Sequence, residues 1–338
     1  MRSIILFAGC FILCFIVSCS RNRYVVNTSG INPGIKVTRV EEILFGSDPA
    51  KLGSTLLELK KNHPKPMRYF SYAIHAGEME DTSWSDRIQA FCTEKLNYDV
   101  YLSVKQKYND INGLEAGLNE AFRYYIYYFP GKPVPEVFTC VTGFNNSIII
   151  GDSTLGIGLD RYLGPVSDFY PRLGIYKYQS DRMTPENILP DCMYAWASTE
   201  WSYDSAGYAA DNVLASIIHE GKLMYFVRSM LPGLGESEIF GFTESQYKFC
   251  TQNEGQMWQY LVEHDLLFST DRLVIRKLTG EAPFTSFFSN ESPGRAAVWV
   301  GFRIVESYMK NNRDVSLSDL LTSAAPDMIL EKGRYSPD

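Results

Sequence analysis

Residues 211–230 read DNVLASIIHEGKLMYFVRSM, and this stretch decides how the rest of the chain is interpreted. Its apolar residues predict a helix, which Pro232-Gly233 ends. His219-Glu220 matches the first half of the pattern HExxH, in which two His one helical turn apart bind zinc and the Glu activates the metal-bound water. Leu223 stands where the second His belongs, and a leucine side chain has no lone pair to donate. The sequence therefore first raises the question whether this helix supports any hydrolysis.

The segments around this helix predict a mostly helical α+β fold with one small sheet. Helical periodicity dominates residues 37–132, and three short apolar runs separated by Gly- and Asn-rich turns then predict strands at Val137–Val141, Ser147–Ile150 and Leu155–Leu159. A loop-rich stretch from Gly164 to Ser205 precedes the His219 helix. Thr243 and Gln246 have the spacing of a capping box and open a helix that we expect to run to about His264. Pro293-Gly294-Arg295 precedes another helix, which presents Val298, Phe302, Val305 and Met309 on one side.

This order of elements is similar to that of the smallest zinc-dependent peptidase domains, whose third metal ligand is a Glu on a later helix. We therefore expect a zincin-like fold, a degenerate metallopeptidase, with Glu254 in the position of that ligand. His219 and Glu254 alone would bind zinc weakly, because catalytic zinc usually has three protein ligands and a water. We expect no bound cofactor and no hydrolysis by zinc, which would make the protein a pseudoenzyme. If Glu220 and Glu254 are buried, they need a cationic partner, and Arg295 is our candidate for it.

Two other interpretations of the same helix stay open. In one, the protein is a metal-dependent peptidase or hydrolase that recruits an unrecognised ligand in place of Leu223. In the other, His219 is a hydrogen-bonded core histidine and nothing more.

The N-terminus predicts export and a lipid anchor. An apolar run from Ile4 to Val17 is too short to span a bilayer and has the length of a signal-peptide core. The run ends in small residues before Cys19, which resembles a bacterial lipobox, so we expect a signal peptide at residues 1–18 and acylation of Cys19. A polar tether at residues 19–36 would then lead to a single domain at residues 37–338, with a helical part up to residue 132 and the sheet and His219 helix in residues 133–338.

Composition narrows the class of partner. The 338 residues carry a formal net charge of −7, which argues against nucleic acid as a ligand. The high content of Tyr and Phe suits a well-packed protein that docks on other proteins. Four cysteines besides the anchor, Cys92, Cys140, Cys192 and Cys250, lack metal-ligand spacing and are either disulfide-bonded or buried free thiols.

Several separated motifs resemble the gliding motility lipoprotein GldB family of Bacteroidota over nearly the whole mature chain. They are Leu155–Gly164, His219–Phe226, Asn253-Glu254 with Met257-Trp258, and Ser292–Arg295 continuing through Trp299, Gly301, Ile304-Val305 and Tyr308-Met309. The run from Glu220 to Phe226 is itself typical of this family, so the loss of the second His resembles a family trait.

The resemblance implies a lipid-anchored accessory protein of gliding or of the associated secretion and outer-membrane machinery, with envelope proteins as partners. Cys19 is followed by Ser20-Arg21-Asn22-Arg23, without the acidic pair that in this bacterial group resembles a surface-display signal. We therefore expect an outer-membrane lipoprotein that faces the periplasm.

The lipobox generates a first prediction. Cys19→Ser should abolish incorporation of labelled fatty acid and release the protein from the membrane fraction, because the acylated thiol is the expected anchor. Labelling in the native host, followed by membrane fractionation, measures both effects. A variant that stays on the membrane, beside a wild type that takes up no label, would contradict the lipoprotein interpretation.

Overall fold

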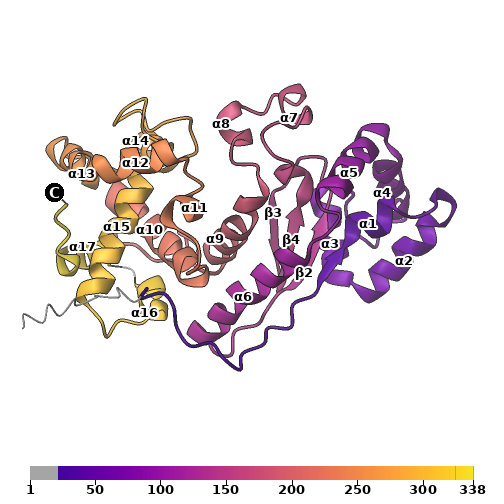
Figure 1. The fold of residues 1–338 in the computed structure, drawn as a ribbon, viewed down its shortest axis with the longest axis horizontal. Coiled ribbons are helices and arrows are strands. Elements are labelled where there is room, and N and C mark those ends of the chain that lie inside the picture. Colours follow the sequence, from indigo (N-terminus) through magenta and orange to yellow (C-terminus); the bar gives the residue numbers. More distant parts are fainter. Residues whose placement is uncertain (1–21, 324, 338) are drawn as a thin grey trace, which may run out of the picture.

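The computed structural model describes residues 22–323 and 325–337 of the chain, so the expected signal peptide and Cys19 lie outside the described residues (Figure 1). Most of the described chain is helical, with one small sheet near the middle of the long axis. The helices are α1 (Val40–Phe45), α2 (Leu52–Asn62), α3 (Pro64–Ala73), α4 (Trp84–Thr93), α5 (Lys95–Lys107), α6 (Asn112–Tyr128), α7 (Phe169–Arg172), α8 (Lys177–Ser180), α9 (Ile188–Glu200), α10 (Val213–Met230), α11 (Glu236–Phe240), α12 (Glu244–Gln252), α13 (Glu254–Glu263), α14 (Arg272–Thr279), α15 (Ala296–Asn311), α16 (Leu317–Thr322) and α17 (Pro326–Gly333). Short 3₁₀ turns occupy Pro49–Lys51, Leu159–Tyr162, Pro185–Asn187 and Leu266–Phe268.

The sheet has four strands in the order β1-β2-β4-β3. Its strands are β1 (Val37–Arg39), β2 (Glu136–Cys140), β3 (Ile148–Gly151) and β4 (Thr154–Gly158). β1, β2 and β4 run parallel to one another, whereas β3 pairs with β4 in antiparallel register and forms one edge. The predicted mostly helical α+β fold is confirmed, and each of the three predicted strands lies within one residue of its observed position.

The fourth strand, β1, was not predicted. It has three residues and runs directly into α1, so the local sequence offers no period-2 pattern to separate strand from helix. β1 comes from the part expected to be wholly helical, and the sheet therefore joins that part to the rest of the chain. Glu41 strengthens this connection, because its buried carboxylate accepts hydrogen bonds from Thr139 of β2 at 2.8 Å and from Arg39 at 2.9 Å.

Helix α10 is the centre of the other half of the molecule. Every residue of α10 is buried except Glu220 and Arg228, as expected for a helix that is apolar on all sides. Its closest partner is α15, and the two helices meet at a pair of glycines. A Cβ atom added to Gly301 would lie 1.8 Å from the carbonyl oxygen of Ile217, and one added to Gly221 would lie 2.4 Å from the carbonyl of Gly301. Only glycine permits this backbone approach.

Two predicted segments are corrected by the structure. The stretch expected to be loop-rich contains α9, whose buried Ile188, Cys192, Met193 and Trp196 recur at helical spacing within irregular flanking sequence. The helix opened by Thr243 does form its capping box, with Thr243 N–H donating to Gln246 and Gln246 N–H donating to Thr243. It ends at Gln252, however, and a separate helix, α13, starts at Glu254.

The described part of the expected tether, residues 22–36, contacts the folded body near both of its ends. In Figure 1 it runs beneath α6 from the neighbourhood of α16 to β1. Tyr24 and Ile35 are buried, and the Ile35 N–H and C=O both bond to the side-chain amide of Asn119 on α6. Within the described residues, no helix combines the length and apolar character needed to cross a bilayer.

The glycine contact generates a second prediction. Gly301→Ala should lower the free energy of unfolding by about 1–3 kcal/mol, because the added methyl group forces α10 and α15 apart. Gly113→Ala in α6 is the matched control, since nothing lies within 4 Å of its added Cβ, and it should be neutral or slightly stabilising. Denaturant titrations of both variants measure the difference, and equal stabilities would show that the helix crossing tolerates a larger separation.

Candidate functional site

A groove separates the sheet from the α10–α15 half of the molecule. One cavity of about 310 Å³ lies at the start of β3, and a second of about 450 Å³ adjoins it and shares Arg182 and Glu281 with it. We call the two together the arginine groove, because its walls carry three arginines among polar and aromatic residues: Ser147, Ile148, Arg161, Tyr162, Arg182, Asp191, Tyr194, Glu281 and Arg295.

Glu220 is held by two residues that line this groove. Its carboxylate accepts a hydrogen bond from the Tyr194 hydroxyl at 2.8 Å and from Arg295 Nη2 at 2.7 Å. The Arg295 guanidinium also lies over the Tyr194 ring, 5.2 Å from its centroid, and reaches Glu281 at 3.3 Å. The expected ion pair between Arg295 and Glu220 is therefore present, and both side chains are largely buried, with 17% and 22% of their surface exposed.

The backbone at Arg295 is held in an unusual conformation. Its φ of +61° lies in the left-handed region, which costs a non-glycine residue roughly 1 kcal/mol or more. The next residue, Ala296, donates its N–H to Thr285 Oγ1 at 2.9 Å, and the Thr285 hydroxyl donates to the Pro293 carbonyl at 2.8 Å. These buried bonds fix the turn before α15 and aim the Arg295 side chain at Glu220.

His219 faces a pocket of aromatic residues on another side of α10. Its Nδ1 lies 3.0 Å from the Tyr208 hydroxyl, and the rings of Tyr203 and Tyr208 meet its imidazole edge to face. Burial and the nearby charge of Lys222 lower the pKa of His219 to about 4, so the ring is neutral at pH 7. Leu223 is buried in the core.

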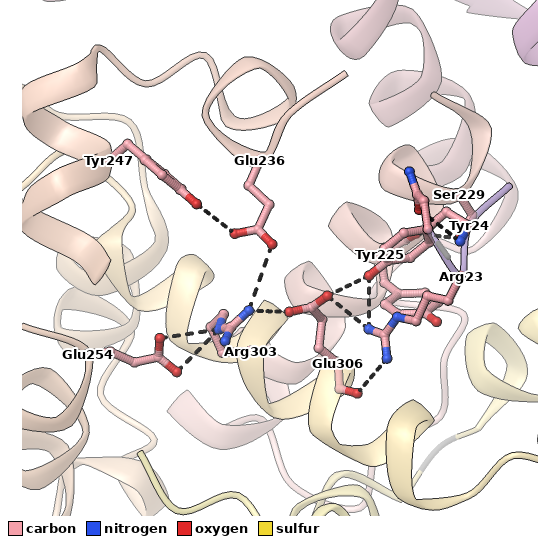
Figure 2. A network of polar contacts seen from close by, with 10 residues as sticks. Arg23, Tyr24, Tyr225, Ser229, Glu236, Tyr247, Glu254, Arg303 and Glu306 are labelled. Carbon is pink, nitrogen blue, oxygen red and sulfur yellow. Dashed lines mark hydrogen bonds and ion pairs between the residues drawn. The ribbon is translucent and has the colours of Figure 1, made fainter. Parts of the chain in front are cut away.

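Glu254 belongs to a different network, which Figure 2 shows around α15. Its carboxylate accepts from Arg303 Nε at 3.2 Å and from the Tyr335 hydroxyl at 2.9 Å. Arg303 also contacts Glu306 and Glu236, the latter at 3.8 Å. The expectation that Arg295 neutralises both glutamates is thus half wrong, because Arg303 is the partner of Glu254.

The donor atoms do not fit a zinc ion. His219 bonds to a tyrosine, Glu220 to Tyr194 and Arg295, and Glu254 to Arg303 and Tyr335, so each candidate ligand has a separate set of partners. In the described part of the chain, no three His, Cys, Asp or Glu side chains converge as metal ligands would. We therefore derive no catalytic step through a metal.

Sequence reasoning missed most of the residues that line the groove. Arg161 donates to Ser147 Oγ at 3.2 Å and to the Phe144 carbonyl, and it has no carboxylate partner within residues 22–323 and 325–337. Arg182 reaches Glu281 and Asp191 only at 3.4 and 3.7 Å. Arg161 lies in a motif on which the family resemblance rests, and that was the one available signal. Arg182 and Asp191 lie in the stretch expected to be loop-rich.

The four cysteines of the described chain, Cys92, Cys140, Cys192 and Cys250, are free and buried, which decides between the alternatives that the sequence left open. Burial raises the pKa of Cys92 and of Cys250 to about 12, so neither is a reactive thiolate at neutral pH.

These features define a mostly helical α+β protein in which arginines neutralise both candidate acidic ligands. Residues 21–337 match the family model described as gliding motility protein GldB, and the chain belongs to this family, as its motifs predicted. Membership implies a membrane-anchored lipoprotein with a role in gliding motility. Comparisons with curated proteins and with solved structures gave no match.

The ion pair generates a third prediction. Arg295→Ala should lower the free energy of unfolding by about 3 kcal/mol, because it leaves the Glu220 carboxylate buried without a counter-charge. Arg313→Ala is the control, since Arg313 is exposed and outside the ion pairs of the described chain, and it should change stability by less than about 0.5 kcal/mol. Denaturant midpoints measure both effects. An unchanged midpoint for Arg295→Ala would show that the ion pair does not stabilise the fold.

His219 generates a fourth prediction, on pH. An unfolded His binds a proton below about pH 6.5, whereas the folded His219 does so only below about 4, so protonation favours the unfolded chain between these values. Stability should therefore fall by roughly 3 kcal/mol as pH drops through this window. Because Asp160, whose pKa burial raises to about 6, acts in the opposite direction, the measurement compares wild type with His219→Gln at each pH. Parallel pH profiles of the two proteins would contradict the assignment.

Proposed function

We propose that this protein is a lipid-anchored, periplasm-facing accessory of the gliding or associated secretion and outer-membrane machinery that binds an extended segment of a partner protein in the arginine groove. In this proposal the zincin-like fold is inherited from a peptidase, and the groove is the former substrate cleft. One observation carries the proposal: the open edge of strand β3 lies beside Arg161 and Arg182, two arginines without a close carboxylate partner among the described residues.

The open edge belongs to β3. In antiparallel pairing alternate residues direct their N–H and C=O groups to the neighbouring strand, and Ser147 accepts from Gly158 N–H, which fixes the alternation. The backbone groups of Ile148 and Ile150 then point away from β4. No hydrogen bond between described residues uses these groups outside the sheet, and Ile148 lines the groove. An extended chain can add to such an edge by main-chain hydrogen bonds.

The charges beside this edge favour an acidic segment. Arg161 has no carboxylate partner among the described residues, and Arg182 has two distant ones and a buried Nε without a hydrogen-bond partner. Arginine binds a carboxylate through two parallel hydrogen bonds, which gives both energy and orientation. The partner segment therefore carries a carboxylate, either of a side chain or of a chain terminus, at the position that faces Arg161 and Arg182.

The contacts of Glu220 and His219 support binding rather than hydrolysis. Glu220 is neutralised by Arg295, so it is not available as a general base toward a bound peptide. His219 is turned to Tyr208. The same ion pair that removes the base fixes the wall of the groove and keeps its shape without a metal.

A fifth prediction tests this function. A photo-crosslinking amino acid at Gln179, which lines the groove, should capture a partner in the native envelope, whereas the same residue at exposed Leu57 on α2 should not capture it. Arg161→Gln should reduce the capture about tenfold or more, because a charge-assisted pair is lost. Arg68→Gln on α3 is the matched control, since Arg68 is exposed and lines neither cavity of the groove.

Two outcomes would overturn the proposal. Capture that is insensitive to Arg161→Gln places the partner elsewhere. One zinc per chain in protein purified without chelator, together with loss of cellular function in Glu220→Gln, would instead support the metal-dependent hydrolase with a non-standard ligand set.

A further inference from the structure

The N-terminal segment is clamped to α10 and α15 directly after the expected anchor. Glu306 on α15 accepts hydrogen bonds from the Tyr24 hydroxyl at 2.5 Å and from Arg23 at 2.8 Å, as Figure 2 shows. The Tyr24 ring packs on Tyr225, and the Arg228 guanidinium lies 4.8 Å from the centroid of the Tyr24 ring. Burial raises the pKa of Tyr24, so its hydroxyl remains a donor to Glu306 at neutral pH. Asn22 adds a bond from its side-chain amide to the Pro232 carbonyl at 3.0 Å.

This clamp limits how far the body can move from an anchored Cys19. Three peptide steps separate Cys19 from Asn22, and each extended residue spans at most about 3.6 Å, so the reach is about 11 Å whatever path the chain takes. Eleven ångströms is about the diameter of one α-helix with its side chains. The face that carries Asn22, Arg23 and the neighbouring end of α15 must therefore lie against the headgroups of the membrane that holds Cys19.

A polar cavity of about 640 Å³ opens beside the clamp on this face, between α15 and the chain that follows α17. Four cations and two carboxylates line it: Arg23, Arg303, Lys310, Arg334, Glu254 and Glu306. The two carboxylates are occupied by Arg23, Arg303, Tyr24 and Tyr335. Lys310 and Arg334 are exposed and have no carboxylate partner among residues 22–323 and 325–337. The cavity thus carries an excess of positive charge on a chain whose net charge is −7.

We propose that this cavity binds the phosphate of an anionic phospholipid headgroup, so that the lipoprotein lies on the membrane in one orientation with α15 and α17 toward the lipid. The inference rests on the anchoring at Cys19. Lys310 and Arg334 supply the free charge, and the clamped Arg23 supplies a guanidinium already held within reach of the bilayer. Each Lys or Arg near an anionic membrane surface contributes about 1 kcal/mol of attraction. Several such cations on one face therefore favour one orientation of a protein that is already tethered.

The orientation leaves the arginine groove free. In Figure 1 the rim of the groove near α8 lies on the opposite side of the molecule from α16 and from the start of the N-terminal segment. With the clamp face on the membrane, β3 and the arginines beside it are directed toward the aqueous compartment, where a partner segment can reach them.

The test uses the mature acylated protein in vesicles that contain a quencher on the lipid headgroup. A fluorophore is attached to Ser336→Cys at the rim of the cavity or to Thr82→Cys near α4, at the other end of the molecule. The four cysteines of the described chain are buried, and burial raises the pKa of each thiol, so they do not compete for the label. Quenching should be strong at position 336 and weak at 82. Equal quenching at the two positions would overturn the orientation, whereas protein that is absent from the vesicles would instead refute the anchoring.

A second arm tests the headgroup. Quenching at position 336 should be stronger in vesicles with phosphatidylglycerol than in phosphatidylcholine alone. Replacing Lys310 and Arg334 by Gln should lower the equilibrium constant for membrane contact about fivefold per removed cation. Lys51→Gln with Lys61→Gln removes the same charge from the start and the end of α2, which Figure 1 shows at the other end of the molecule, and should have no effect. Equal losses in the two double variants, or equal quenching in the two lipid compositions, would overturn the lipid assignment.

Discussion

The close crossing of α10 and α15 at Gly221 and Gly301 is the constraint on which both functional regions depend. The two backbones approach so closely that a single methyl group at position 301 would collide with the Ile217 carbonyl. Because the crossing fixes the rotation of α15, it places Arg295 opposite Glu220 at one end. Toward the other end it places Glu306 against Tyr24, whose ring packs on Tyr225 of α10. With larger residues at this contact, the two helices would cross at a greater distance. The Arg295–Glu220 pair and the contact of Glu306 with Tyr24 would then be lost.

Ion pairs between arginine and glutamate occur at the start of α15 and again farther along the helix. At its start, Arg295 neutralises the carboxylate that an HExxH enzyme would use as a base. Farther along, Arg303 and Glu306 join Glu254, Glu236 and the N-terminal Arg23 in one network (Figure 2). Partly buried pairs of this kind add little net stability over apolar residues, but removing one partner is costly. They therefore hold specific segments in place, here the wall of the groove and the anchored end of the chain.

The residues that match the HExxH pattern and its expected third ligand each have a partner within the protein. A buried histidine needs a polar partner, and Tyr208 supplies one to His219. Glu254 is held by Arg303 and Tyr335, in a network separate from that of His219. A histidine placed at position 223 would therefore join a helix whose neighbouring candidate ligands already bond to other side chains.

Local sequence determined the elements that have strong periodicity or clear end signals. The α10 helix, the three strands after Pro133 and the Thr243 cap follow from apolar spacing, turn residues and side-chain hydrogen bonds within a few positions. The family motifs were also readable without a structure. Tertiary packing alone decided that β1 joins the sheet, that Arg303 and not Arg295 neutralises Glu254, and that residues 22–36 lie on the body. Each of these depends on contacts between segments far apart in the chain, and no local pattern encodes which distant charge or strand will be the neighbour.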